Sequence, residues 1–161
     1  MSFPIVALNL FLGKASLVTY AGGGSETDPT EHGFKELGFK EGDWNYKDSY
    51  TGFFQSWGRE MVWFQGKPFW AQLYGGGMAP EHQGDEGFAH KTFSFLKKVL
   101  STGEKSKTFQ PRGPTSFRDE EWEYMCEWQG NIQKFNGNEM IRYKGKVVFT
   151  HDFFGGLIVS K

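Results

Sequence analysis

Polar and apolar residues alternate with two different periods along this chain of 161 residues, and the two periods predict different elements. Apolar residues recur at helical spacing over residues 4–18, and the same spacing predicts a second helix over residues 85–100. Proline suits the first turn of a helix and glycine often follows the last one. We therefore expect these helices to end at the glycine run 22–24 and at Gly103.

Alternation with a period of two predicts strands elsewhere, and short turn signals separate them into antiparallel hairpins. The predicted strands cover residues 34–39, 44–51, 59–64, 68–74, 116–119, 121–128, 139–143 and 146–153. Turns are predicted at residues 41–43, 65–67, 136–137 and 144–145, a surface loop at residues 25–31, and a strand end at the glycine run 75–77. Helices that interrupt antiparallel runs indicate an α+β fold rather than a parallel sheet.

The segment from Trp44 to Gly77 recurs in the sequence as the segment from Trp122 to Gly156. Identical residues, at an offset of 78 that becomes 79 after one inserted residue, are Trp44 and Trp122, Tyr46 and Tyr124, Gly52 and Gly130, Gln55 and Gln133, Glu60 and Glu139, Met61 and Met140, Gly66 and Gly145, Lys67 and Lys146, Gly76 and Gly155, and Gly77 and Gly156. Repeated units fold alike and cover each other's apolar faces. We therefore predict one domain over residues 1–161, in which two repeats (about 4–78 and 85–158) place two helices on a curved antiparallel sheet.

The composition narrows the class of protein. The 17 Phe, 6 Trp and 6 Tyr, together with 22 Gly, are typical of a β-rich chain. A net charge of −1 gives no field for binding nucleic acid, and the lysine-rich stretch 97–107 is interpreted as solvated surface. Cys126, the single cysteine, excludes an internal disulfide and fits a reducing compartment. The apolar stretch 3–13 is too short to span a bilayer and lacks the basic residues of a signal peptide, so we expect a cytoplasmic protein without membrane contact.

Several common reaction and cofactor motifs are missing from the sequence. The glycine runs 22–24, 75–77 and 155–156 lack the residues of a phosphate-binding loop, so we interpret them as positions of positive φ or close backbone approach. The His and Cys residues have no zinc-site spacing, and no Gly-x-Ser-x-Gly elbow is present. We therefore expect no metal and no cofactor.

Two glutamates at equivalent repeat positions are the first candidates for chemistry. Glu60 and Glu139 each lie on an apolar strand face, where a carboxylate is costly to bury unless it is paired. Pseudo-symmetry would bring both to the joint between the repeats, where burial and mutual repulsion raise at least one pKa. They would then recognise a ligand or act as general acid and base, assisted by His151. Alternatively, each lies at a strand end and binds a backbone N–H or an arginine such as Arg59 or Arg142.

Aromatic residues on the same strand faces are the second set of candidates. The predicted ligand-binding residues are Trp44, Tyr46, Asp48, Tyr50, Trp70, Trp122, Tyr124 and Trp128. Ligand pockets are mostly apolar and aromatic with a few converging polar groups, and aromatic rings beside acids suit a planar apolar or a cationic ligand. The same rings can equally form plain core.

Short motifs spread over most of the chain carry a family resemblance. They are Phe11-Leu12, Thr19-Tyr20-Ala21-Gly22, Glu41-Gly42-Asp43 with Tyr46 and Tyr50, Gly58-x-Glu60-x-Val62-Trp63, Pro68-x-Trp70-Ala71, Arg112-Gly113-Pro114, Phe135-Asn136-Gly137 and Phe154-Gly155-Gly156. In combination they resemble a family of uncharacterised bacterial domains that occur alone or fused behind a helix-turn-helix regulator. That position implies an effector sensor, although this chain has no helix-turn-helix segment of its own. A duplicated α+β unit with an acid in an aromatic pocket is also similar to gyrase-inhibitor-like effector-binding domains.

Three functional hypotheses follow from these observations. The favoured one is a small-molecule-binding module whose ligand lies near the joint between the repeats and is oriented by Glu60, Glu139 or Asp48. The second is an enzyme that uses Glu60 or Glu139 as acid and base in the same cavity, with His151 assisting. The third is an interaction protein that pairs with another chain, or with a second copy of itself, through an exposed aromatic patch.

Overall fold

The computed structural model describes residues 3–21, 26–102 and 108–160. Helix α1 (Phe3–Ser16) continues into a π-helical turn, η1 (Leu17–Ala21), and helix α2 (Glu86–Ser101) follows a single 3-10 turn, η2 (Pro80–His82). The strands are β1 (Glu26–Thr27), β2 (Lys35–Glu41), β3 (Trp44–Gly52), β4 (Gln55–Phe64), β5 (Lys67–Met78), β6 (Ser116–Asp119), β7 (Trp122–Asn131), β8 (Lys134–Tyr143) and β9 (Lys146–Leu157). Two helices and nine antiparallel strands within these ranges confirm the predicted α+β class. The glycine run 22–24, Gly103 and most of the lysine-rich stretch lie outside the described residues.

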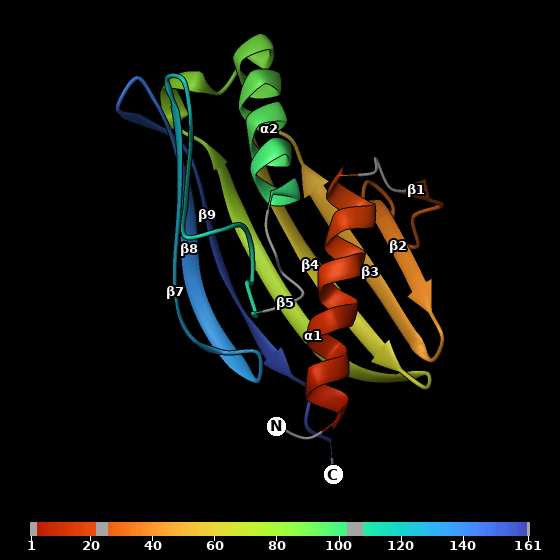
Figure 1. Ribbon diagram of the computed structural model, residues 1–161. Helices are drawn as coiled ribbons and strands as arrows, with labels where there is room; N and C mark the ends of the chain where they lie inside the picture. The colour runs from red at the N-terminus through yellow and green to blue at the C-terminus, as the bar shows by residue number, and fades with distance from the viewer. Residues whose placement is uncertain (1–2, 22–25, 103–107, 161) are drawn as a thin grey trace.

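All nine strands belong to one antiparallel sheet whose strand order is β1-β2-β3-β4-β5-β9-β8-β7-β6. The last strand of the first meander, β5, pairs with the last strand of the second, β9. On both sides of this central pair, each strand further out is the one that precedes it in the sequence: β4, β3, β2 and β1 beyond β5, and β8, β7 and β6 beyond β9. Both helices lie against one face of the sheet (Figure 1), so that face carries the core.

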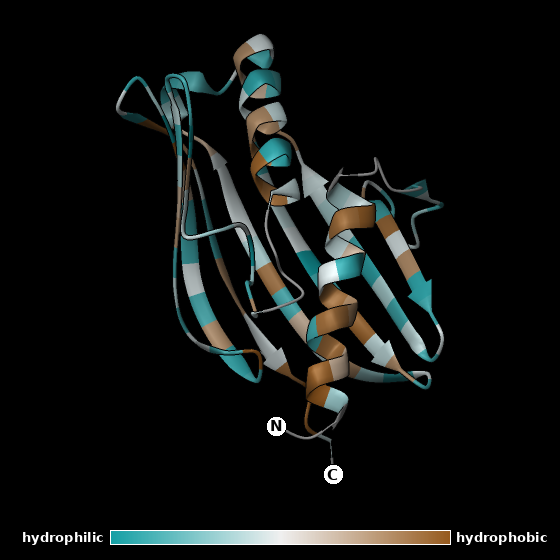
Figure 2. Cartoon of the chain, viewed as in Figure 1, coloured by the Kyte–Doolittle hydropathy of each residue, from teal (hydrophilic) through white to brown (hydrophobic). Residues whose placement is uncertain are grey.

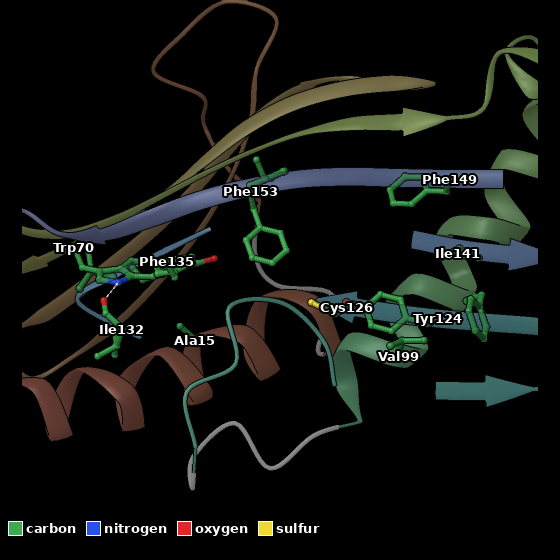
Figure 3. Packing of buried hydrophobic residues seen from close by; sticks show 14 of the residues in the cluster. Ala15, Trp70, Val99, Tyr124, Cys126, Ile132, Phe135, Ile141, Phe149 and Phe153 are labelled. Atoms are coloured by element: carbon green, nitrogen blue, oxygen red, sulfur yellow. Dashed lines mark hydrogen bonds between the residues drawn. The ribbon is translucent and has the colours of Figure 1, made fainter. Parts of the chain in front are cut away.

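Strand alternation explains how the core forms, because every second side chain of β3, β4, β5, β7, β8 and β9 points towards the helices. In Figure 2 the strands carry brown, pale and teal bands rather than one continuous colour. Register places buried residues side by side across three strands, as Tyr46, Val62 and Trp70 in one half and as Tyr124, Ile141 and Phe149 in the other. The Trp70 indole N–H donates to the carbonyl of Ile132 at 3.0 Å, which satisfies its one polar group inside the core (Figure 3).

Helix α2 lies where the sequence predicts a helix, and it packs its apolar face against the sheet. The Asp85 carboxylate accepts a hydrogen bond from the backbone N–H of Phe88 at 2.9 Å and so caps the first turn. The buried residues of α2 recur at helical spacing: Ala89, Thr92, Phe95, Val99 and Leu100. This face covers the sheet, and the predicted range 85–100 differs from the observed helix by one residue at each end.

The prediction that the glycine run 75–77 ends a strand is wrong, because β5 continues through it to Met78. Gly76 has a φ of 136°, and a Cβ there would collide with the carbonyl oxygen of Thr150 on β9. These glycines therefore allow close approach at the centre of the sheet.

The turn predicted at Asn136-Gly137 is also wrong, since both residues lie inside β8 and the chain reverses at Ile132-Gln133. A Cβ on Gly137 would collide with the carbonyl oxygen of Glu127 on β7, so this glycine serves strand pairing. The loop predicted at residues 25–31 contains the short strand β1, which pairs with β2.

Candidate functional site

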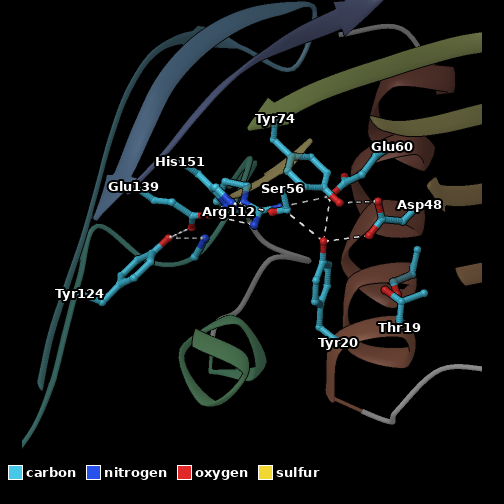
Figure 4. Close-up of polar contacts among 12 residues, drawn as sticks. Thr19, Tyr20, Asp48, Ser56, Glu60, Tyr74, Arg112, Tyr124, Glu139 and His151 are labelled. Atoms are coloured by element: carbon cyan, nitrogen blue, oxygen red, sulfur yellow. Dashed lines mark hydrogen bonds and ion pairs between the residues drawn. The ribbon is translucent and has the colours of Figure 1, made fainter. Parts of the chain in front are cut away.

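A polar cluster is buried in the core-facing side of the sheet, beneath the helices (Figure 4). Its members are Tyr20, Asp48, Ser56, Glu60, Tyr74, Arg112, Tyr124, Glu139 and His151. Tyr20 comes from η1, Arg112 from the connection between α2 and β6, and the others from strands of both halves. Charged groups are rarely buried unless they are paired, so their convergence at one place marks it as a candidate site.

Strand register aligns six of the core-facing residues into two rows. The first row consists of Asp48, Glu60 and Gln72, which are neighbours across β3, β4 and β5. The second row consists of Cys126, Glu139 and His151, which are neighbours across β7, β8 and β9. Each row has a glutamate on its middle strand, and all six side chains are buried. The glutamates that the sequence singled out therefore both point inward, towards the same cluster.

Arg112 connects the two rows. Its Nε and Nη2 atoms both donate to Glu139 Oε1 at 2.8 Å, and its Nη1 lies 3.5 Å from Glu60 Oε1. The guanidinium carbon lies 4.8 Å from the ring centre of Tyr74, within the range of a cation–π contact. A single buried cation thus lies between carboxylates contributed by both halves of the sheet.

Glu139 is held in its charged form despite complete burial. Burial alone would raise the pKa of this carboxyl, but the Arg112 charge and hydrogen bonds from His151 and Tyr124 outweigh it and lower the pKa well below 4.5. The Tyr124 hydroxyl donates to Oε2 at 2.7 Å and itself accepts the backbone N–H of Gly113 at 3.0 Å. Glu139 is therefore an acceptor of hydrogen bonds at neutral pH and has no proton to give.

Asp48 shows the opposite behaviour. Burial raises the pKa of its carboxyl, although hydrogen bonds from Tyr74 and Tyr20 and the Arg112 charge oppose this. The Tyr74 hydroxyl donates to Oδ1 at 2.8 Å and the Tyr20 hydroxyl to Oδ2 at 3.1 Å. Neutral hydroxyls compensate the lost hydration less well than a cation does, so Asp48 is the acid whose charge responds most readily to its surroundings.

His151 lies between Glu139 and a serine. Its Nδ1 atom is 3.1 Å from Glu139 Oε1, and its Nε2 atom is 3.4 Å from the hydroxyl oxygen of Ser56. Burial lowers the pKa of this imidazole, although Glu139 opposes the shift. His151 is therefore neutral at pH 7.

A cleft of about 390 Å³ opens between α2, η1 and the sheet. Its walls include the apolar or aromatic residues Tyr50, Phe53, Phe93, Leu96 and Phe149. Its polar lining includes Asp48, Ser56, Tyr74, Arg112 and His151, all members of the polar cluster. This volume is in the range of small-molecule sites, which combine apolar walls with a few converging polar groups.

A second, much smaller cavity of about 30 Å³ is also lined by Arg112. Glu60, Tyr46 and Trp70 line it together with Gln110, whose side-chain oxygen has no hydrogen-bond partner in the described residues. The volume suits about one water molecule. Tyr46 and Trp70, two of the predicted ligand-binding residues, thus lie beside this small cavity.

Other predicted ligand-binding residues lie away from the cleft. Trp44 packs among Phe11, Phe64 and Phe69 at one end of the sheet. Trp122 packs among Phe88, Phe95 and Tyr143 beneath α2 and borders a separate surface hollow. The Trp128 ring contacts that of Phe109. Tyr124 supports Glu139, which leaves Asp48 and Tyr50 as the predicted ligand-binding residues that line the cleft.

The arginine that pairs with both glutamates was missed by sequence reasoning. Arg59 and Arg142 point to the opposite face of the sheet, because they lie an odd number of positions from Glu60 and Glu139 on their strands. Arg59 instead pairs with Glu31 at the surface. Arg112 stands in an irregular connection, where no periodicity signals which way a side chain points; its only signal was the Arg112-Gly113-Pro114 motif.

Comparison with protein families identifies this chain as a member of the family described as a domain of unknown function, DUF5680, which matches residues 48–158. Comparison with curated proteins and with solved structures found no match. The matched range contains both rows, Arg112 and Ser56, but begins after Tyr20. Among the described residues, no His, Cys, Asp and Glu side chains gather in a way that could hold a metal ion, and no helix is long and apolar enough to cross a bilayer.

Proposed function

We propose that this protein binds a small molecule in the cleft beneath α2. The apolar or aromatic body of the ligand lies against Tyr50, Phe53, Phe93 and Phe149, and a cationic or hydrogen-bonding group is directed at Asp48. The observation that carries this proposal is the convergence of a buried carboxylate with aromatic walls in the lining of a hollow of about 390 Å³. Sites of this size and lining bind ligands in many folds.

The charge balance of the polar cluster favours a cation over a neutral ligand. Asp48, Glu60 and Glu139 are three carboxylates, and Arg112 is the one guanidinium among the described residues of the cluster. A neutral His151 adds nothing to the balance. An ammonium or amidinium group that reaches Asp48 therefore gains a nearby opposite charge and lowers the pKa of that carboxyl. Lysines that also line the cleft are exposed to solvent, where salt screens them.

A thermal-shift comparison of matched probes tests this proposal. Planar aromatic amines and amidines are compared with neutral compounds of the same shape, such as 2-phenylethylamine with 2-phenylethanol. A ligand bound only by the native state stabilises it, by about 2.7 kcal/mol at a hundredfold excess over Kd. We expect the cationic probes to raise the Tm more than their neutral counterparts.

Two variants decide whether Asp48 is responsible. Asp48→Asn removes the charge in the cleft, whereas Asp152→Asn removes one from an exposed position on the opposite face of β9. The preference for cations is expected to disappear in Asp48→Asn and to persist in Asp152→Asn. Equal shifts by charged and neutral probes in the unmodified protein would contradict the proposal, as would an unaltered preference in Asp48→Asn.

A sensor role and a duplicated origin extend this proposal. The two rows occupy equivalent repeat positions on equivalent strands, which supports two repeats of one helix-plus-meander unit closing a curved sheet around the site. The resemblance to domains fused behind helix-turn-helix regulators supports an effector sensor that works with a DNA-binding partner in the cytoplasm. Ligand-dependent co-purification with such a partner, measured with and without an amine that shifts the Tm, tests the sensor role.

A further inference from the structure

Ser56, His151 and Glu139 lie in a line across four strands. Ser56 on β4 is opposite Gly76 on β5, Gly76 is opposite His151 on β9, and His151 is opposite Glu139 on β8. Gly76 has no side chain, so the serine and the imidazole reach each other across β5. The resulting distances are 3.4 Å from Ser56 Oγ to His151 Nε2 and 3.1 Å from His151 Nδ1 to Glu139 Oε1.

The surroundings of His151 select one of its two neutral tautomers. The ionised Glu139 carboxylate can only accept hydrogen bonds, so the proton of the neutral imidazole lies on Nδ1 and is donated to Oε1. The lone pair of Nε2 then points at Ser56, whose hydroxyl donates to it. Arg112 and Tyr124 fix Glu139 from its other sides, so the imidazole has one preferred orientation.

Ser56 and His151 are also open to a ligand. Both line the cleft of about 390 Å³. Arg112 lines the same cleft, and a fixed positive charge in the cleft wall can attract an oxyanion that forms on a bound carbonyl group.

We propose that Ser56, His151 and Glu139 form a nucleophile, a base and a positioning acid that hydrolyse small carboxylic esters bound in the cleft. This activity goes beyond the proposed binding function, which depends on Asp48. Serine, histidine and a carboxylate in this order recur on unrelated folds and are recognised by geometry rather than by a sequence elbow. The 3.4 Å separation of serine and histidine is within the looser range seen before a substrate is bound.

The reaction balances with water as the only co-reactant. Ser56 Oγ attacks the ester carbonyl carbon while His151 Nε2 takes the hydroxyl proton, and the positive charge of Arg112 attracts the oxyanion. The carbon–oxygen bond to the alcohol breaks, and His151 returns the proton to the departing alkoxide. Water then attacks the acyl-serine ester, again giving a proton to Nε2, and the carboxylic acid leaves as Ser56 regains its proton.

Covalent labelling of the full chain tests the nucleophile. The purified protein is treated with a fluorophosphonate probe, and intact mass and peptide mapping locate any adduct. Hydrolysis of 4-nitrophenyl butyrate is measured in parallel. We expect one adduct on Ser56 and turnover that falls at least about 100-fold in Ser56→Ala and in His151→Gln, because each loses a group that acts on the reacting atoms. Ser94→Ala removes an exposed hydroxyl from α2, outside the cleft lining, and is expected to change neither result.

Glu139 is tested as a positioning residue by a readout that folding alone would not move. In Glu139→Gln, nitrogen NMR of His151 is expected to show loss of the single Nδ1–H tautomer, together with slower labelling of Ser56. An unchanged circular dichroism spectrum of Ser56→Ala shows that the variant folds normally. Its loss of turnover then comes from the missing hydroxyl. The proposal is overturned if the probe leaves Ser56 unmodified, or if Ser56→Ala retains hydrolysis.

The outcomes also separate this proposal from the binding function. An adduct on Ser56 without any amine-dependent rise in Tm supports the hydrolase and overturns the proposed cation site. A rise in Tm with amines but no adduct overturns the hydrolase and supports the cation site.

Discussion

Asp48 and Glu139 are both buried carboxylates on the same face of the sheet, yet their pKa values are shifted in opposite directions. Burial raises the pKa of both. Glu139 contacts the Arg112 guanidinium at 2.8 Å, whereas the nearest donors to Asp48 are the neutral hydroxyls of Tyr74 and Tyr20. A cation in direct contact therefore outweighs burial, and neutral hydroxyls do not. Each row thus carries a buried acid, one with a raised pKa and one with a lowered pKa.

The inner ends of the two rows, on the central strands β5 and β9, also differ in how their polar groups are satisfied. His151 in the second row contacts both Glu139 and Ser56. Gln72 in the first row is fully buried, and neither its amide nitrogen nor its oxygen has a hydrogen-bond partner in the described residues. An unsatisfied buried amide costs stability, while a satisfied imidazole contributes to it. Gln72 and His151 therefore contribute differently to stability, although they occupy equivalent positions in the sheet, because their neighbours differ.

The largest effect is expected from removing the cation that joins the rows. Arg112→Met leaves Glu139 and Glu60 buried without their shared partner, and a broken buried ion pair costs about 3–5 kcal/mol of unfolding free energy. Urea denaturation at neutral pH measures this loss. Arg118→Met removes an arginine whose side chain is 73% exposed and pairs with Glu123, so it is expected to cost at most about 1 kcal/mol. Equal losses in the two variants would show that Arg112 does not join the rows.

An intermediate effect is expected from the ends of the rows. Gln72→Met replaces an unsatisfied buried amide by an apolar chain of similar length, so the unfolding free energy should stay the same or rise by up to about 1 kcal/mol. His151→Leu removes a hydrogen bond to a charged carboxylate and should cost about 1–3 kcal/mol. Urea denaturation of both variants measures the difference. A substantial loss in Gln72→Met would mean that the two row ends are alike.

A smaller effect is expected from pH. The pKa of His151 is lower in the native state than the 6.5 of an unperturbed histidine, so below pH 6.5 the unfolded chain binds a proton that the native protein does not. As the pH is lowered from 7.5 towards the native pKa of His151, the unfolding free energy should therefore fall. This group contributes at most about 1.4 kcal/mol per pH unit to that fall. Asp48 acts in the opposite direction above pH 3.8, because its native pKa is raised above that value.

Urea midpoints from pH 7.5 to pH 5.5 test this dependence. His151→Gln should flatten it, and His32→Gln, at an exposed loop position, should leave it in place. If the pH dependence of the urea midpoint persisted in His151→Gln, a group other than His151 would be its source.

Periodicity predicted most elements, because alternation and helical spacing are local properties of the chain. Glu60 and Glu139 could be placed on a core-facing side from their apolar neighbours alone. Gly76 and Gly137 were misread as a strand end and a turn, since the carbonyl oxygens that require a glycine belong to other strands. Local sequence does not contain that information.

The acids of the site could be predicted from the sequence, but their partner Arg112 and the contact between Ser56 and His151 could not. Arg112 lies in an irregular connection, where direction follows from packing rather than from spacing. Ser56 meets His151 across a strand that separates them in the sheet, a contact that depends on the β5–β9 pairing between the halves. Trp44 and Trp122 were among the predicted ligand-binding residues, yet large rings contribute most by filling core, and these two pack at the ends of the sheet.

Nitrogen NMR of His151 tests the central claim, that the second row holds a neutral imidazole between an ionised carboxylate and a serine. A titration of the histidine-labelled protein reports both the pKa and the tautomer. We predict a pKa below 6.5 and, at pH 7.5, a single neutral form with its proton on Nδ1. A pKa above 6.5, or a proton on Nε2 at neutral pH, would contradict the account, because Nε2 could then no longer accept the Ser56 hydroxyl.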